Sequence, residues 1–158
     1  MNRLLLALAF AVPAFAQSPG QPCGAPEHRQ FDFWIGEWDV RNAAGRVVGT
    51  NTITALHKGC ALMENWTGAG GATGSSLNIY DASRKQWHQT WVDSSGSLLE
   101  LDGNFADGAM VLRSASGDNR ITWRVLPDGR VRQLWETSPD NGATWKTSFD
   151  GYYEKKGK

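Results

Sequence analysis

The most constraining feature of the sequence is a series of tight-turn signals that divides the chain into short segments of alternating polarity. From Glu37 onward, apolar and polar residues alternate with a period of two, which is typical of β-strands. Dipeptides such as Asp107-Gly108 and Asp128-Gly129 separate the segments and favour hairpins, because these turns need positive φ. We expect strands at 37–42, 46–56, 61–68, 75–80, 86–92, 97–103, 109–115, 120–126, 130–137 and 145–153.

Links this short make each strand pair antiparallel with the strand before it. A row of about ten short strands leaves exposed edges unless the sheet closes on itself. We therefore predict an all-β fold, a calycin- or lipocalin-like antiparallel up-and-down β-barrel of about ten strands, with a flattened sandwich as the alternative. The length suits one domain, which we place at 31–158.

The N-terminus has the composition of a secretory signal peptide. Arg3 precedes an apolar run and a small-residue pattern that ends at Ala16, so we expect residues 1–16 to be removed on export. The run is too short to span a membrane, and we expect no integral membrane segment after cleavage. Residues 17–30 are rich in proline and are expected to form an irregular leader. The predicted location is periplasmic or secreted.

The two cysteines, Cys23 and Cys60, are expected to pair with each other. In an exported protein, such a pair favours one disulfide. The bond would close a loop of roughly 38 residues and stabilise the fold by about 3–4 kcal/mol in the chain-entropy model. We expect it to tie the leader to the barrel, since the C-x-x-C spacing of redox catalysts is missing.

Charge and motif content argue against several classes of function. The chain has 16 basic and 16 acidic residues, so it lacks the basic surplus of nucleic-acid-binding proteins, and we predict no nucleic-acid partner. No P-loop, dinucleotide fingerprint or G-x-S-x-G motif occurs, and no two of the 3 histidines have a metal-ligand spacing. We therefore predict no metal site and no cofactor. The oligomeric state stays open.

Five of the expected strands have one largely apolar set of alternate residues, which we expect to face the barrel interior. These sets are Leu62, Glu64 and Trp66; Trp87, Gln89 and Trp91; Ile121, Trp123 and Val125; Val131, Gln133 and Trp135; and Trp145, Thr147 and Phe149. Glu64, Gln89 and Gln133 are polar exceptions, and Thr147 is a weaker one. Because a buried polar group without a partner costs roughly 1–3 kcal/mol, several at similar depth indicate mutual hydrogen bonds, bound water or a ligand.

Two interpretations of this interior remain open. In one, the polar side chains form a closed network inside a packed core, and the protein is a ligand-free envelope scaffold. In the other, they line a pocket whose wall is largely apolar, which is the usual composition of ligand sites. The residues expected to line that pocket are Glu64, Trp66, Trp87, Gln89, Trp91, Trp123, Gln133 and Trp135. We favour the pocket, with a small apolar or amphipathic molecule as its partner.

A small enzyme is the third alternative. A carboxylic acid in an apolar cavity has a raised pKa and can act as a general acid or base. Glu64 is the catalytic candidate, with Gln89 and Gln133 as oxyanion-type donors. Glutamates that only form structural networks are commoner, so we favour binding over catalysis.

The stretch FDFWIGEWDV, Phe31 to Val40, contains Gly36-Glu37-Trp38 at the entry to the first expected strand. This G-x-W motif resembles the lipocalin and calycin signature, in which the tryptophan plugs one end of the barrel. We expect the aromatic residues of this stretch to form such a plug.

The wider sequence resembles a family of uncharacterised, exported bacterial proteins that are expected to be calycin-like barrels. The resemblance rests on FDFWIGEWDV, GCALMENWTG, LNIYDASRKQWHQTWVDSSG, RVRQLWETSPDNGATW and FDGYY, and it covers Cys23 to Tyr153. It implies a fold and a ligand rather than a reaction. In calycins a late arginine often stacks on the G-x-W tryptophan, whereas Lys155 and Lys156 follow the last expected strand here.

The segment SPDNGATW, Ser138 to Trp145, matches the Asp-box pattern of sialidase-type propellers. A propeller needs one copy per blade, and the sequence has a single copy. We therefore expect a hairpin in which Asp140 accepts backbone N–H bonds and Trp145 packs beneath it.

Overall fold

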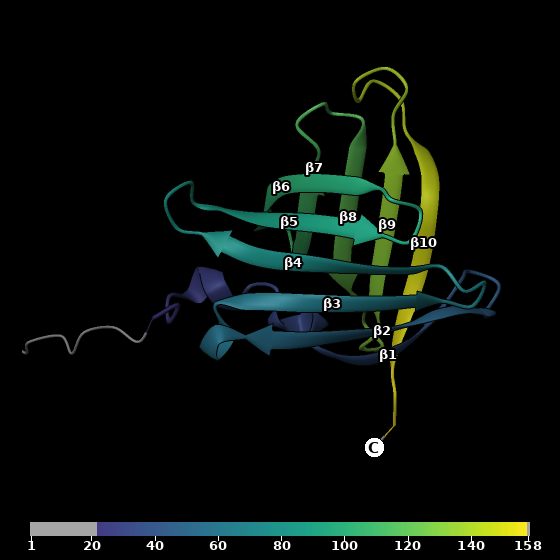
Figure 1. Ribbon diagram of the computed structural model, residues 1–158, viewed down its shortest axis with the longest axis horizontal. Helices are drawn as coiled ribbons and strands as arrows, with labels where there is room; N and C mark the ends of the chain where they lie inside the picture. Colours follow the sequence, from purple (N-terminus) through teal and green to yellow (C-terminus); the bar gives the residue numbers. More distant parts are fainter. Residues whose placement is uncertain (1–21, 158) are drawn as a thin grey trace, which may run out of the picture.

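The computed structural model describes residues 22–157 and forms a closed barrel of ten antiparallel strands (Figure 1). The strands are β1 (Gly36–Arg41), β2 (Val47–Leu56), β3 (Ala61–Gly68), β4 (Thr73–Asp81), β5 (Gln86–Asp93), β6 (Leu98–Ala106), β7 (Ala109–Arg113), β8 (Asn119–Val125), β9 (Val131–Thr137) and β10 (Lys146–Lys155). Three short 3-10 helices accompany them: η1 (Pro26–Arg29), η2 (Asp32–Trp34) and η3 (His57–Gly59). The described part of the chain contains no helix that is both long and apolar enough to cross a membrane. The predicted signal peptide and residues 17–21 lie outside the described residues.

Each strand pairs with its neighbours in sequence, and the barrel closes where the first strand meets the last. Val40 on β1 lies opposite Tyr153 on β10 across this seam. Because β1 and β10 are hydrogen-bonded neighbours, the predicted up-and-down barrel is confirmed and the sandwich alternative is wrong. The architecture is consistent with a calycin-like fold.

The alternation of side chains places the apolar sets inside, as predicted for the central strands. Along β5, Trp87 and Gln89 are each 2% exposed. Along β8, Trp123 is fully buried, whereas Val125 at the strand end is exposed. Burial is therefore set by the face of the strand and by the distance from the barrel ends.

The expectation for the last strand is wrong at its start. Phe149 lies opposite Trp135, whereas Thr147 lies opposite the outward-facing Glu136, so the register shifts between Thr147 and Phe149. Such a bulge inserts one extra residue, here Ser148, and reverses the alternation on one side of it. Thr147 therefore faces outward and is exposed.

The hairpin before β10 has the predicted aspartate-centred form. Asp140 Oδ1 accepts the backbone N–H of Thr144 at 2.7 Å and the hydroxyl of Ser138 at 2.8 Å. Trp145 packs on the outer surface, where the Arg120 guanidinium lies 4.1 Å from the centre of its ring. The predicted hairpin is confirmed, and the inward position expected for Trp145 is wrong because the bulge follows it.

The aromatic segment before β1 fills one end of the barrel, which confirms the predicted plug. Phe31 and Trp34 are both fully buried, and their ring centroids lie 5.0 Å apart. Phe31 also lies edge-on to Trp87 at 5.6 Å and to Trp123 at 5.2 Å. The Trp38 indole N–H donates to the backbone oxygen of Trp34 at 2.9 Å. These rings and this bond leave the plug tightly packed.

Lys155, at the end of β10, lies over the tryptophan of the G-x-W motif. Its Nζ lies 5.3 Å from the centre of the Trp38 ring, within the range of a cation–π contact. Gly36 begins β1 with φ of 147°, a conformation that side chains rarely adopt. The lysine therefore covers the tryptophan of the G-x-W motif from the solvent side.

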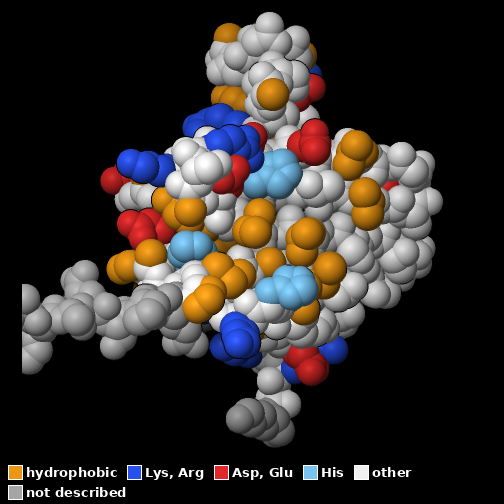
Figure 2. All heavy atoms as spheres, turned by 60° about the vertical axis from the view of Figure 1, so that its left-hand side comes forward, with side chains coloured by type: hydrophobic (Ala, Val, Ile, Leu, Met, Phe, Trp, Pro, Cys, Tyr) orange, Lys and Arg blue, Asp and Glu red, His pale blue; other side chains and the backbone are white. Residues whose placement is uncertain are grey.

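The outer surface carries both hydrophobic and polar side chains. Figure 2 shows one side of the molecule, on which hydrophobic side chains lie between histidines that stand apart from one another. Leu77 and Ile79 are among the exposed hydrophobic residues of the described chain. His88 lies on the outer face of β5, with Nδ1 2.9 Å from Asp102 and Nε2 2.9 Å from the Thr90 hydroxyl.

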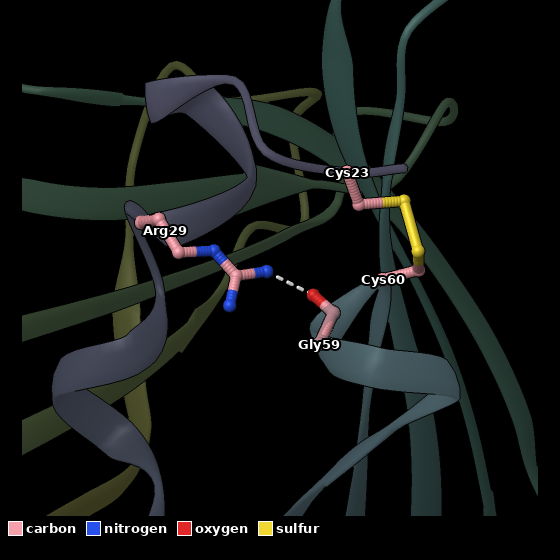
Figure 3. The surroundings of a disulfide bond; sticks show 4 residues. All are labelled: Cys23, Arg29, Gly59 and Cys60. Atoms are coloured by element: carbon pink, nitrogen blue, oxygen red, sulfur yellow. Dashed lines mark hydrogen bonds between the residues drawn. A yellow bond between two sulfur atoms is a disulfide. The ribbon is translucent and has the colours of Figure 1, made fainter. Parts of the chain in front are cut away.

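A disulfide ties the N-terminal segment to the barrel, as predicted. Cys23 and Cys60 are bonded, with their Cα atoms 5.2 Å apart. Beside this bond, the Arg29 guanidinium donates to the backbone oxygen of Gly59 (Figure 3). Both links join the segment before β1 to the connection between β2 and β3, which lies at the plug end.

Candidate functional site

A cavity of about 250 Å³ opens at the end of the barrel opposite the plug. It is lined by Glu64, Trp66, Gln89, Trp91, Leu99, Ile121, Gln133, Trp135, Ser148, Phe149 and Tyr153. The floor is buried, and Glu64 is only 3% exposed, whereas Ser148 at the rim is exposed. The barrel is therefore filled at one end and hollow at the other.

The wall of the cavity consists mainly of aromatic rings, three indoles and Phe149. The Trp91 indole N–H donates to Asp93 at 3.2 Å, and that of Trp135 donates to the side-chain oxygen of Asn119 at 2.8 Å. These bonds hold the polar edges of two indoles at the strand ends. The rest of each ring is apolar, and it is this surface that a ligand in the cavity would meet.

Two glycines let the indole rings lie against the barrel wall. A Cβ atom at Gly74 would lie 2.2 Å from the Trp91 ring, and one at Gly49 would lie 2.4 Å from the Trp66 ring. Carbon atoms that are not bonded do not approach so closely. Each ring therefore occupies space that a side chain would otherwise fill, and the lumen stays open.

The floor of the cavity is a hydrogen-bonded polar network centred on Glu64. Asn51 Nδ2 donates to Glu64 Oε1 at 2.7 Å, and the Ser76 hydroxyl donates to Oε2 at 2.6 Å. Ser76 Oγ accepts from Asn78 at 2.9 Å and from Gln89 at 3.3 Å. Gln89 Nε2 also donates to Asn78 Oδ1 at 2.7 Å. The network runs across four neighbouring strands, β2 to β5.

A second branch of the network reaches the closing seam of the barrel. Asn51 Nδ2 donates to the Tyr153 hydroxyl at 3.3 Å, and that hydroxyl donates to Gln133 Oε1. The Tyr153 ring lies 6.1 Å from the ring of Trp38. Tyr153 therefore joins the plug to the cavity floor.

Burial controls the ionisation of the two acidic groups of the floor. Desolvation raises the pKa of Glu64 from 4.5 to about 7, although the hydrogen bonds from Ser76 and Asn51 oppose the rise. Desolvation, with a smaller effect of the Glu64 charge, raises the pKa of Tyr153 well above its usual value of 10. The tyrosine is therefore neutral at physiological pH, and Glu64 changes charge near neutrality.

Six of the eight residues expected to line a pocket lie at this cavity: Glu64, Trp66, Gln89, Trp91, Gln133 and Trp135. The other two, Trp87 and Trp123, face inward but lie at the plug, where both contact Phe31. Alternation along a strand predicts the face on which a side chain lies. It does not predict the depth, because depth depends on which end of the barrel is filled.

Several residues of the site were missed by sequence reasoning. The missed floor residues are Asn51, Ser76, Asn78 and Tyr153, and the missed lining residues are Leu99 and Ser148. Ile121 and Phe149 also line the cavity; they were expected to face inward but were not named as pocket residues. On β4 the usual pattern is inverted: Ser76 and Asn78 are buried, while Leu77 and Ile79 are 44% and 39% exposed. The sequence contains only an indirect indication of Ser76 and Asn78: a buried glutamate at position 64 needs hydrogen-bond donors on the neighbouring strands.

The arrangement offers only part of the chemistry expected of an acid–base site. Both amide-nitrogen bonds of Gln89 go to Ser76 and Asn78, so this residue presents its oxygen rather than an oxyanion-type donor. Gln133 accepts the Tyr153 hydroxyl, which leaves its amide N–H groups for a ligand. Within residues 22–157, no group of three or more His, Cys, Asp or Glu side chains is placed to hold a metal ion.

Comparison with known proteins does not assign a family. No protein-family model matches the chain, and a search of curated proteins finds no match. The resemblance to exported calycin-like proteins therefore stays a prediction.

Proposed function

We propose that the protein is an exported barrel that binds a small apolar or amphipathic molecule in its open end. The observation that carries this proposal is the composition of the cavity, in which an aromatic and aliphatic wall stands above a polar floor. Ligand sites combine a largely apolar wall with a few convergent polar groups. The volume of about 250 Å³ is below the roughly 300–1,000 Å³ of drug-sized ligand sites, so the ligand is small.

Location in the periplasm or outside the cell is part of the proposal. The bond between Cys23 and Cys60 supports it, because disulfides form and persist mainly in oxidising compartments. The same bond holds the plug end together, so the barrel needs an oxidising environment to keep its full stability.

A variant that blocks the cavity mouth tests the binding function. Ser148→Trp adds a large ring at the exposed rim, whereas Ala115→Trp adds one to the β7–β8 turn at the same end without touching the cavity. Isothermal titration calorimetry with indole and with phenethyl alcohol compares both variants with the wild-type chain. We expect the wild type and Ala115→Trp to bind at least one probe, and Ser148→Trp to lose affinity by about tenfold or more, which is roughly 1.4 kcal/mol.

The same titrations can contradict the proposal. If neither probe binds the wild type, or if Ser148→Trp binds as tightly as Ala115→Trp, the cavity is not the binding site of such molecules. Such a result would instead favour the alternative interpretation, an envelope scaffold that binds no ligand.

Acid–base catalysis by Glu64 is a second candidate function. It is favoured by the pKa of about 7 at a carboxyl group that lines the cavity, because an effective general acid or base has a pKa near the working pH. A Glu64→Gln substitution should abolish turnover of a substrate that still binds. Turnover equal to that of the wild type would exclude this role for Glu64.

A further inference from the structure

Glu64 is a buried carboxyl group without a positively charged partner. Its hydrogen-bond donors are the neutral side chains of Asn51 and Ser76. None of the ion pairs among the described residues includes Glu64. Buried charges in proteins are normally paired, because an isolated ionised group loses its hydration at a large cost. The cavity floor therefore has no positive charge, among the described residues, to balance Glu64 when this carboxyl group is ionised.

Two oxygen atoms near this carboxylate also lack a donor. Asn51 Oδ1 is buried and has no hydrogen-bond partner among the described residues. Gln89 lines the cavity and uses its amide nitrogen for Ser76 and Asn78, while its oxygen accepts no bond from the described residues. Gln133, on the far side of the floor, uses its oxygen for Tyr153 and has N–H groups with no acceptor among the described residues. The floor beside Glu64 is therefore rich in hydrogen-bond acceptors, of which those of Glu64 and Gln89 line the cavity, and it is complementary to a group with N–H donors.

The wall above this side of the floor suits a cation with an apolar body. Trp66 follows Glu64 on the inner face of β3, and Trp91 follows Gln89 on the inner face of β5. Indole is the aromatic ring that attracts cations most strongly, by roughly 0.5–2 kcal/mol per contact. Its flat apolar surface also packs against a hydrocarbon body.

We infer that the cavity selects an organic ammonium ion, whose protonated amine pairs with Glu64 while its apolar body packs against Trp66 and Trp91. This inference rests on the proposed binding function and names the chemical class of its ligand. A charge-assisted hydrogen bond from the ammonium group supplies the missing positive charge. Spare N–H groups of the same amine can reach neighbouring acceptors on the floor.

Three probes of similar size and different charge test the inference on the full barrel. Phenethylamine, phenethyl alcohol and hydrocinnamate are titrated into the wild-type protein at a pH of about 8, at which the alkyl amine is still protonated. We expect phenethylamine to bind about tenfold or more tightly than phenethyl alcohol, since hydrogen bonds to charged groups are roughly twice as strong as neutral ones. Hydrocinnamate should bind most weakly, because its carboxylate would face Glu64.

The pH dependence of the amine affinity gives a second readout without any substitution. Below the pKa of about 7, Glu64 is protonated and loses its charge, whereas the amine keeps its own. Asn51, Ser76 and Gln89 do not titrate, and Tyr153, the other titratable side chain of the floor, stays neutral. We expect the affinity for phenethylamine to fall about tenfold or more between pH values of about 8 and 5.5, while that for phenethyl alcohol stays level.

Glu64→Gln keeps the size of the side chain and removes its charge. We expect this variant to lose both the preference for phenethylamine over phenethyl alcohol and the pH dependence of the amine affinity. Circular dichroism checks that the variant is folded, and if it is not, the wild-type pH series decides.

The possible outcomes separate this inference from the binding function. If alcohol and amine bind the wild type equally at both pH values, the ammonium inference is overturned and the cavity remains a binding site. If none of the three probes binds, the proposed function is overturned as well.

Discussion

The two ends of the barrel are lined by the same type of residue, yet one is solid and the other is hollow. At the plug, Trp34 and Trp123 are fully buried and pack around Phe31. At the open end, Trp91 and Trp135 are half-buried and surround a cavity of about 250 Å³.

The difference arises from what lies beside the rings. The chain before β1 folds into the plug end, and its aromatic side chains fill the space there. At the open end, Gly49 and Gly74 leave room for indole rings against the barrel wall. A high tryptophan content therefore predicts neither a packed core nor a pocket, because the neighbours of each ring decide which one forms.

The largest expected difference between the two ends is in stability. Trp34→Ala removes a fully buried ring from the plug and should lower the free energy of unfolding by about 3–5 kcal/mol. Trp135→Ala removes a half-buried ring next to existing empty space, so we expect a loss of about half that size. Urea unfolding followed by circular dichroism measures both, and equal losses would show that the two ends are packed alike.

Breaking the disulfide should weaken the plug end without altering the open end. A Cys23→Ser, Cys60→Ser double variant is expected to lose about 3–4 kcal/mol of stability in the chain-entropy model, for a sequence separation of 37 residues. Urea unfolding gives the stability, and titration with phenethyl alcohol gives the affinity at the cavity. A large loss of affinity in a variant that is still folded would show that the two ends are coupled.

The ionisation of Glu64 should make the stability of the open end depend on pH. The carboxyl pKa is higher in the folded state, about 7, than its ordinary value of 4.5, so folding favours the protonated form. This stabilisation is complete below pH 4.5 and is lost as the pH rises to about 7, by about 3 kcal/mol in all. Urea unfolding at several pH values should show a decline in the wild type that is absent from Glu64→Gln. Parallel curves for the two proteins would contradict the raised pKa.

The smallest expected effect concerns the glycine beneath Trp91. Gly74→Ala places a Cβ atom 2.2 Å from the indole ring, so the ring must move toward the lumen, at a cost of about 1–3 kcal/mol. Gly70→Ala is the matched control, because its Cβ atom would meet nothing within 4 Å. We expect weaker binding of phenethyl alcohol and a shifted tryptophan emission in Gly74→Ala alone. If Gly74→Ala behaves like its control, the glycine does not shape the cavity.

Sequence reasoning predicted the strands and the plug because both depend on local patterns. Turn dipeptides and alternation mark each strand, and the aromatic cluster next to Gly36 marks the segment that fills the barrel end. The same reasoning failed for Thr147, because a single inserted residue, Ser148, reverses the alternation and leaves no local signal. It also missed Ser76, because on β4 the polar side chains face inward and the Ser76 hydroxyl donates to Glu64 on the neighbouring strand β3.

The sequence by itself determined the ten strands, the order of strand pairing, the disulfide and the presence of polar residues such as Glu64 and Gln89 on the inner face. It did not predict the three 3-10 helices, of which η1 lies in the expected irregular leader. The tertiary structure alone decided the depth at which each inner side chain lies, the partners of the buried glutamate and the position of the cavity. The reason is that alternation and turn formation act over a few neighbouring residues. Depth and hydrogen-bond partners depend instead on register between strands and on the segment that fills one end of the barrel.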